Sequence, residues 1–216
     1  MVLVGDVFNS NSCGSFTVVS IESFKKVKVR FNDTGYECYA RSDSVKKGKL
    51  KDKLHPSVHG VGFIGDGEFK TSLNGRNNKA YLTWQRMLGR CYDNNNASSN
   101  YYVDCSVSPE WHDFQNFAKW FYDNYPESDQ EIHLDKDIKI KGNKVYSKES
   151  CLLVSLSENV SHAKAKSFKI ISPTGETVNI YNLERFCKRN NLNKSNMHKV
   201  ATGKNKSCKG WTTYYE

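Results

Sequence analysis

Titratable side chains cluster in one short segment, where His133, Asp135, Lys136 and Asp137 stand within five positions. Carboxylates are ligands that hard divalent cations prefer, an imidazole can accept a proton, and an ammonium group can contact a phosphate. Residues 132–138 have the pattern of a strand, so His133, Asp135 and Asp137 are expected on one face of it. The same charged residues could instead form a structural ion-pair cluster, and both interpretations stay open at this point.

The elements that must position this cluster are rich in aromatic residues. Apolar residues at helical spacing indicate one helix, at Tyr81, Trp84, Leu88 and Cys91. A second helix is expected to begin with Ser108 as its N-cap and Pro109 at its first position. Its buried face should hold Trp111, Phe114, Phe117, Ala118 and Phe121. A strand at 132–138, a turn at 141–143, a returning strand at 151–154 and a helix at 155–162 then predict a ββα unit.

The first part of the chain is predicted to be a small β unit. Strands are expected at 15–21, 26–32 and 36–41, because Val27, Val29 and Phe31 alternate with charged residues. A small antiparallel sheet or an SH3-like barrel fits residues 1–55. Residues 56–78 contain five glycines and are predicted to be a linker or an extended arm.

The last part of the chain is predicted to be a hairpin followed by a helix-turn-helix. Strands at 168–171 and 177–180 flank Pro173-Thr174-Gly175. Asn182 and Asn193 are expected to cap two short helices, Gly203 to end the second, and a strand at 210–215 to close against the hairpin. Two short helices joined by a three-residue turn fit the description of a helix-turn-helix.

Charge indicates a nucleic-acid partner for this last part. The chain has a net charge of +9, and from Ala163 to the end eleven Lys and Arg residues stand against three acids, a local excess of +8. Such asymmetry is typical of a surface that neutralises phosphates. The side chains expected to contact DNA are Arg185, Lys188, Arg189, Lys194, Ser195, Asn196, His198, Lys199, Lys204 and Lys206. An ordinary helical hairpin with a solvated polar face is the alternative.

Composition excludes some classes of protein. Membrane-spanning proteins need about 18 consecutive apolar residues, and this chain has no such stretch. The first residues do not have the pattern of a signal peptide, so the seven cysteines, which form no CxxC pair, are expected to be reduced thiols. No dimerisation pattern is visible, and a monomer is expected.

Two stretches resemble the HNH homing endonucleases that phages and introns encode. The C-terminal stretch is similar to the modular DNA-binding repeat at the tail of these enzymes, at Ser172-Pro173-Thr174-Gly175, Asn182, Gly203-Lys204 and Lys209-Gly210-Trp211. The middle stretch resembles phage-encoded HNH-like proteins at W-x-x-M-x-x-R-C-Y from Trp84, W-x-x-F-x-x-F from Trp111, and the segment from Leu134 to Cys151.

The resemblance implies a ββα-metal core with a divalent cation. By this resemblance, Asp135 is the metal carboxylate and Asn159, in the helix after the second strand, is the other ligand. Both are hard oxygen ligands that suit Mg²⁺ or another divalent metal such as Mn²⁺. That metal would stabilise the charge that develops on the phosphate during hydrolysis.

Two positions depart from the family pattern. The general-base position holds Lys136, and the position of an asparagine that pins the second strand falls on Ser150. A lysine accepts a proton at neutral pH only where burial disfavours the ammonium form, and the two flanking aspartates favour that form. Lys136 could instead contact the scissile phosphate, and His133 is the substitute candidate for the general base.

The sequence therefore predicts an α+β protein with four parts: a small β unit (1–55), a glycine-rich arm (56–78), an HNH-like core (79–163) and a helix-turn-helix module (164–216). The predicted function is metal-dependent, site-specific nicking or double-strand cleavage of DNA by an endonuclease of the phage homing type. The alternative is a catalytically degenerate DNA-binding protein that acts as a regulator or inhibitor. Double-stranded DNA is the expected partner, and a cytoplasmic location, in a bacterial host if the chain is phage-encoded, is implied.

Overall fold

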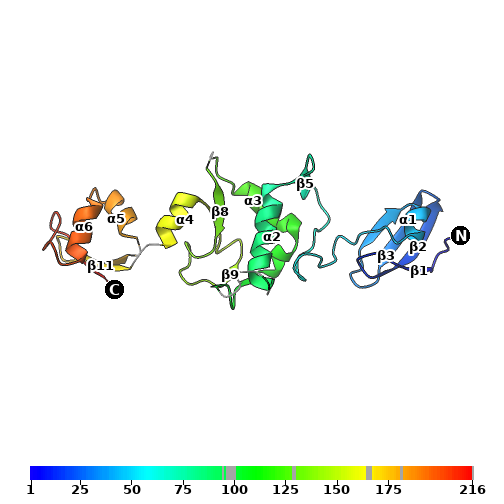
Figure 1. Cartoon of the computed structure of the whole chain (residues 1–216), viewed down its shortest axis with the longest axis horizontal. Coiled ribbons are helices and arrows are strands. Elements are labelled where there is room, and N and C mark those ends of the chain that lie inside the picture. Colours follow the sequence, from blue (N-terminus) through cyan, green and yellow to red (C-terminus); the bar gives the residue numbers. More distant parts are fainter. Residues whose placement is uncertain (94, 96–100, 128–129, 164–166, 181, 216) are drawn as a thin grey trace.

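The chain folds as an α+β protein with several small sheets, as predicted. The computed structural model describes residues 1–93, 95, 101–127, 130–163, 167–180 and 182–215. Three separate hydrophobic cores follow one another along the long axis of the molecule, with the N-terminal unit at one end and the C-terminal module at the other (Figure 1).

The N-terminal unit is an open antiparallel sheet of four strands in the order β1-β2-β3-β4, so the small-sheet alternative is the one observed. Its strands are β1 (Val7–Asn9), β2 (Ser15–Ser23), β3 (Lys26–Phe31) and β4 (Glu37–Ala40), and the short helix α1 (Ser42–Lys46) follows them. The alternation in β3 buries Val27, Val29 and Phe31 in the core of this unit, as the pattern predicted.

The segment 56–78 does not extend away from the protein as a linker or arm. Val58, Val61, Ile64 and Phe69 pack against the middle core, and Phe63 forms a β-bridge with Asp113. Near its end the segment forms a two-residue hairpin, β5 (Ser72–Leu73) and β6 (Arg76–Asn77). The glycines hid this packing, because the apolar residues between them show neither strand nor helix periodicity.

Two helices build the middle core. Helix α2 (Lys79–Tyr92) begins at Asn78, whose side chain accepts the backbone N–H of Tyr81 at 2.7 Å. Ser108 and Pro109 begin a helical segment as expected, but that segment is a single 3₁₀ turn (Pro109–His112). After the extended residue Asp113, which is its N-cap, the separate helix α3 (Phe114–Asp123) begins, so the predicted single helix is two elements. The expected buried face is confirmed at Trp111, Phe114, Phe117, Ala118 and Phe121.

A ββα unit packs beside α2. Strand β8 (Ile132–Asp135) pairs antiparallel with β10 (Leu152–Ser155), and α4 (Leu156–Ala163) follows directly. The short strands β7 (Ser106–Val107) and β9 (Val145–Tyr146) pair in parallel nearby. The expected strand at 132–138 is too long: it ends at Asp135, so His133 and Asp135 share its alternation and Asp137 lies in the following loop.

The C-terminal module agrees with the sequence prediction in its elements. Its sheet has the order β12-β11-β13, formed by β11 (Phe168–Ile171), β12 (Thr177–Ile180) and β13 (Thr212–Tyr215). Helices α5 (Leu183–Arg189) and α6 (Lys194–Ala201) begin at Asn182 and Asn193, and each asparagine side chain accepts a backbone N–H at 3.0 Å. Gly203 follows α6 with a φ of +73°, the left-handed conformation typical of a helix stop.

All seven cysteines are free thiols, as expected. Within the described ranges, no helix is both long enough and apolar enough to cross a membrane.

Removing the side chain of Ile64 tests whether residues 56–78 belong to the middle core. We expect Ile64→Ala to lower the free energy of unfolding by about 1–2 kcal/mol, because the side chain packs on that core. Leu73→Ala is the matched control in the same segment, because Leu73 is 66% exposed, and it should change stability by less than about 0.5 kcal/mol. Urea unfolding followed by tryptophan fluorescence measures both, and equal effects would show that the segment is a free arm.

Candidate functional site

A cavity of about 200 Å³ lies between helix α2, strand β8 and helix α4. Its lining includes all four side chains to which a catalytic role was given from the sequence, namely His133, Asp135, Lys136 and Asn159. Strand β8, the residue that follows it and helix α4 therefore bring these four side chains together, and α2 adds other residues to the lining. In the middle unit, β8 lies between helix α2 and helix α4 (Figure 1).

Asp135 ends strand β8 and also shapes the loop that follows. Its Oδ1 accepts the backbone N–H groups of Asp137 at 2.8 Å and Ile138 at 2.7 Å, which turns the chain out of the strand. Its Oδ2 makes no hydrogen bond within the part of the chain that the structure describes. One carboxylate oxygen is therefore structural, and the other is available to a cation or a water molecule in the cavity.

The Lys136 side chain is buried and fully hydrogen-bonded. The residue is only 8% exposed, and its Nζ donates to both carboxylate oxygens of Asp137 at 2.9 Å and to the backbone carbonyl of Asn143 at 2.8 Å. These contacts account for its three donors. This geometry does not suit a general base, and the ion-pair alternative for Lys136 and Asp137 is the arrangement observed.

His133 presents an imidazole nitrogen that lacks a hydrogen-bond partner. Its Nε2 is buried and unpaired, and the nearest acidic oxygen, Oε1 of Glu131, lies 3.8 Å away. Buried polar atoms in proteins nearly always have a partner, so an unpaired one beside a cavity is a place for a water molecule or a ligand. His133 therefore remains the better candidate for the base.

Asn143 and Ser150 both hold the segment between β8 and β10 through the carbonyl of Val145. The Asn143 Nδ2 donates to the carbonyls of Lys136 at 3.1 Å and Val145 at 2.6 Å, so it bridges the loop after β8 to strand β9. Ser150 is buried and its Oγ donates to the same Val145 carbonyl at 2.8 Å. The Gly142-Asn143 pair was visible as a turn signal, but its reach across the loop depends on the fold.

Two arginines line the cavity and were not assigned to it from the sequence. Arg86 and Arg90 are four residues apart on α2, so they share one helix face with Thr83, which also lines the cavity. Arg86 is exposed and forms no hydrogen bond or ion pair with any described residue. Arg90 lies 5.6 Å from the centroid of the Tyr102 ring. The four-residue spacing of Arg86 and Arg90 is visible in the sequence and could have predicted that they lie on one helix face.

Burial keeps neighbouring groups uncharged. It raises the pKa of the Tyr146 phenol, which lines the cavity, well above its usual range. It also raises the pKa of the Cys151 thiol, directly before β10, to about 11. At neutral pH neither group is a base, so proton acceptance in the cavity is left to the carboxylates and the imidazole.

The donor set fits a hard cation that keeps part of its water shell. No group of three or more His, Cys, Asp or Glu side chains suited to a metal occurs among the described residues. Magnesium, however, is commonly bound through one or two protein oxygens, with waters and substrate phosphate completing its shell. The Oδ2 atom of Asp135 and the amide oxygen of Asn159 are donors of that kind.

A second hollow, of about 430 Å³, lies beside the first. The two share Asp137 as a lining residue, and the basic side chains around the second come from the loop after β8 and from helix α5, at Lys139, Lys141, Arg185 and Arg189. Basic side chains therefore extend from the cavity toward the C-terminal module.

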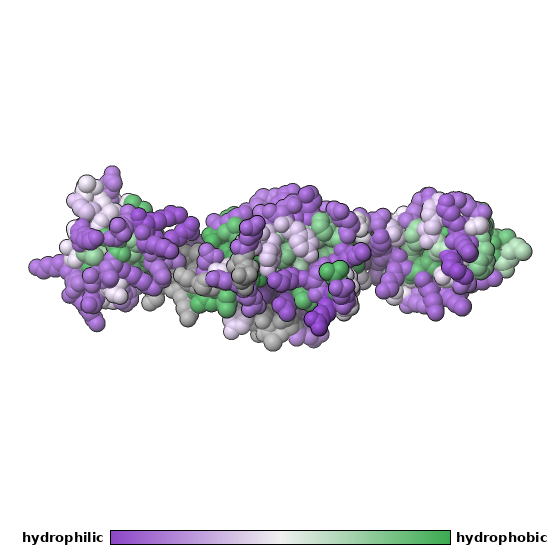
Figure 2. Space-filling model, turned by 90° about the horizontal axis from the view of Figure 1, so that it is seen from above, coloured by the Kyte–Doolittle hydropathy of each residue, from purple (hydrophilic) through white to green (hydrophobic). Residues whose placement is uncertain are grey.

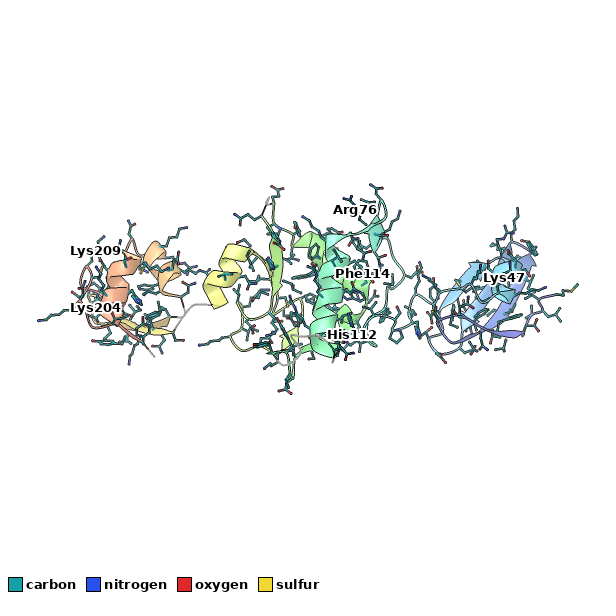
Figure 3. The ribbon with its side chains drawn as sticks, viewed as in Figure 1. Lys47, Arg76, His112, Phe114, Lys204 and Lys209 are labelled. Atoms are coloured by element: carbon teal, nitrogen blue, oxygen red, sulfur yellow. The ribbon has the colours of Figure 1, made fainter. Side chains whose placement is uncertain are left out.

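The ten side chains expected to contact DNA are all exposed on that module. Hydrophilic side chains dominate its visible surface, and Figure 3 labels Lys204 and Lys209 there (Figures 2 and 3). Lys194 is paired with Glu184 at 2.5 Å, and His198 Nδ1 lies 3.0 Å from the hydroxyl of Tyr215. Lys199 has no acidic partner among the described residues, so it is the α6 lysine best able to contact a phosphate.

Comparison with known proteins gives one distant similarity. No family model matches the chain, and no curated protein matches it. A solved structure described as DNA binding and cleavage by the HNH homing endonuclease I-HmuI is 18% identical, with a TM-score of 0.25. The match covers 47% of this chain and 66% of that one, so the chain spans slightly less than two thirds of that structure's length.

Replacing Lys136 separates a structural ammonium group from a base. We expect Lys136→Met to lower the free energy of unfolding by about 1–3 kcal/mol, because it leaves the Asn143 carbonyl and the Asp137 carboxylate without their donor. Lys139→Met, at an exposed position in the same loop, should cost less than about 0.5 kcal/mol. Thermal unfolding by circular dichroism measures both, and unchanged stability in Lys136→Met would contradict the structural role.

Proposed function

We propose that this chain binds double-stranded DNA and hydrolyses a phosphodiester bond in it with the help of a divalent cation. The observation that carries the proposal is the cavity between α2, β8 and α4, which combines a carboxylate, an amide, an unpaired imidazole nitrogen and two arginines. Site-specific cleavage of the phage homing type is the finer form of this proposal, with Mg²⁺ or Mn²⁺ as the cation.

The side chains of the cavity divide the reaction between them. Asp135 and Asn159 would hold the cation, which when bound stabilises the negative charge that develops on the phosphate. Arg86 and Arg90 hold phosphate oxygens by charge-assisted hydrogen bonds. His133 Nε2 accepts a proton as a water oxygen bonds to phosphorus, the P–O bond to the leaving sugar oxygen breaks, and that oxygen takes a proton from solvent.

The C-terminal module would supply most of the binding energy. Exposed cations on α5 and α6 contact phosphates, and the polar side chains of Ser195 and Asn196 lie at the start of α6, where a recognition helix meets base edges. Folding around a separate core lets this module hold the duplex while the cavity acts on the backbone.

A catalytically degenerate DNA-binding protein, acting as a regulator or inhibitor, is the second candidate function. The observation that favours it is the pairing inside the site, where Lys136 is bound to Asp137 and one oxygen of Asp135 is used by the loop. In this case the cavity has no catalytic role, and only the C-terminal module is functional.

Asp135→Asn tests catalysis without removing the loop contacts. The asparagine keeps an oxygen that can accept the N–H groups of Asp137 and Ile138, but it removes the charge that would hold the cation. We expect cleavage of phage or bacterial DNA in Mg²⁺ to fall by about 10²-fold or more, with binding of the duplex retained. Gel assays of cleavage and fluorescence anisotropy in EDTA measure the two properties separately.

Glu149→Gln is a suitable control for the loss of one carboxylate, because Glu149 does not line the cavity. It should leave cleavage unchanged. Intact DNA with Mg²⁺, Mn²⁺ and other divalent metals, together with salt-sensitive binding by the unaltered protein, would favour the degenerate DNA-binding protein over the enzyme.

Two lysines of α6 give a test of binding. Lys199→Ala should weaken duplex binding and reduce the slope of log affinity against log salt by about 0.9, the value for one lost phosphate contact. Lys194→Ala is the matched control in the same helix, since Lys194 is already paired with Glu184 and its loss should change the slope less. Equal slopes for both variants and the unaltered protein would contradict the placement of α6 on DNA.

A further inference from the structure

The N-terminal unit has two groups of basic side chains that differ in their pairing. On the outer face of β3, Lys26 is paired with Glu22 at 2.6 Å, Lys28 with Glu37 at 2.6 Å, and Arg30 with Glu37 at 2.5 Å. A second group begins at the last residue of α1 and continues in the segment after it. It is called here the lysine strip and consists of Lys46, Lys47, Lys49 and Lys51. All four of its side chains are exposed, and none has an ion pair with a described residue. Figure 3 labels Lys47 on this unit, at the opposite end of the molecule from Lys204 and Lys209.

The backbone beneath the lysine strip is fixed to the sheet. The carbonyl of Gly48 accepts the backbone N–H of Asn11 at 3.0 Å, and the carbonyl of Leu50 accepts the hydroxyl of Ser10 at 2.8 Å. Gly48 has a φ of +62°, and a Cβ there would collide with the backbone carbonyl of Asn9. The strip is therefore held against the loop between β1 and β2, and this order reduces the entropy that its binding to a partner would cost.

Burial alternates along the strip. Lys47, Lys49 and Lys51 are exposed, and the residue after each of them (Gly48, Leu50 and Asp52) is buried. Consecutive lysines are two residues apart, so their Cα atoms lie at most roughly 7 Å from one another. This is comparable to the separation of successive phosphates along one strand of a duplex.

The acid nearest to the strip in the sequence, Asp52, does not pair with its lysines. Asp52 is buried, and its carboxylate accepts the Thr34 hydroxyl at 2.5 Å and the backbone N–H of Leu54 at 2.8 Å. Asp52 is adjacent to Lys51 in the sequence, but its side chain points into the protein, whereas the lysine side chains are exposed.

We propose that the lysine strip binds the phosphate backbone of the same double-stranded DNA, outside the segment that the C-terminal module contacts. The proposal rests on the proposed function, because it requires that the chain binds DNA. Every exposed side chain from Lys46 to Asp52 is a lysine, so the contacts of the strip are with phosphates and are independent of base sequence. The N-terminal unit thus lengthens the bound segment without adding to base recognition.

The test compares two triple variants with the same change in charge. The strip variant is Lys47→Gln, Lys49→Gln and Lys51→Gln, and the matched control is Lys26→Gln, Lys28→Gln and Arg30→Gln on the outer face of β3. Each variant loses three positive charges from the same unit. Binding of the full chain to a labelled duplex of random sequence, about 60 base pairs long, is measured by fluorescence anisotropy in EDTA between 50 and 200 mM NaCl.

We expect the strip variant to lose about 2.7 from the slope of log affinity against log salt, since each phosphate contact contributes about 0.9. The control should lose much less, because its cations are already paired. Thermal unfolding by circular dichroism establishes that both variants fold. A duplex of about 15 base pairs is a second probe, on which the strip variant and the unaltered protein should bind alike.

Two results would overturn the proposal while leaving the proposed function standing. One is a slope equal to that of the unaltered protein in the strip variant, and the other is an equal loss of slope in both triple variants, which reports net charge alone. Strip-dependent binding that occurs only with RNA duplexes would also overturn it. Absence of salt-sensitive DNA binding by the unaltered protein is a different outcome, because it contradicts the proposed function itself.

Discussion

The hydrogen bond from the Trp84 side chain to the backbone of Trp111 fixes the geometry on which the candidate site depends. Trp84 is fully buried in α2, and its indole N–H donates to the backbone carbonyl of Trp111 at 2.7 Å. A buried indole must find such an acceptor, so this bond sets the rotation of α2 about its own axis. The rotation that buries Trp84 turns Arg86 and Arg90 toward β8, and a different rotation would leave the cavity without these two arginines.

Asp135 is under a second constraint, because structure and chemistry both use its carboxylate. The loop after β8 takes one oxygen to end the strand, and only the other oxygen can serve a cation. Lys136 then removes Asp137 from competition by binding both of its oxygens. The pairing that weakens the case for Lys136 as a base therefore frees the site of one competing carboxylate. Oδ2 of Asp135, in the lining that also contains Asn159, has no hydrogen bond to any described residue.

Local signals in the sequence were enough to predict the C-terminal module. Asn182, Asn193 and Gly203 act within a few residues of themselves, so capping rules placed both helices. The middle unit was harder, because strand β8 is ended by a side-chain contact and not by a turn residue. The packing of residues 56–78 on α2 is a long-range effect, and a run of glycines gives no periodic signal from which to predict it.

The candidate site shows the same division between local and long-range information. His133, Asp135 and Lys136 were found from a cluster in the sequence, and so was Asp137, the ion-pair partner of Lys136, but the more distant neighbours were not. The Lys136 Nζ donates to the carbonyl of Asn143, seven residues further along the chain. Arg86 lines the cavity from a helix that precedes β8 by about forty residues. Charge alone is likewise a weak guide, since Lys28 and Lys47 look alike in the sequence and only the fold shows that one is paired with Glu37. A basic side chain that is already paired with an acid contributes less to the binding of a polyanion than an unpaired one. Two variants that lose equal charge are therefore expected to differ in binding.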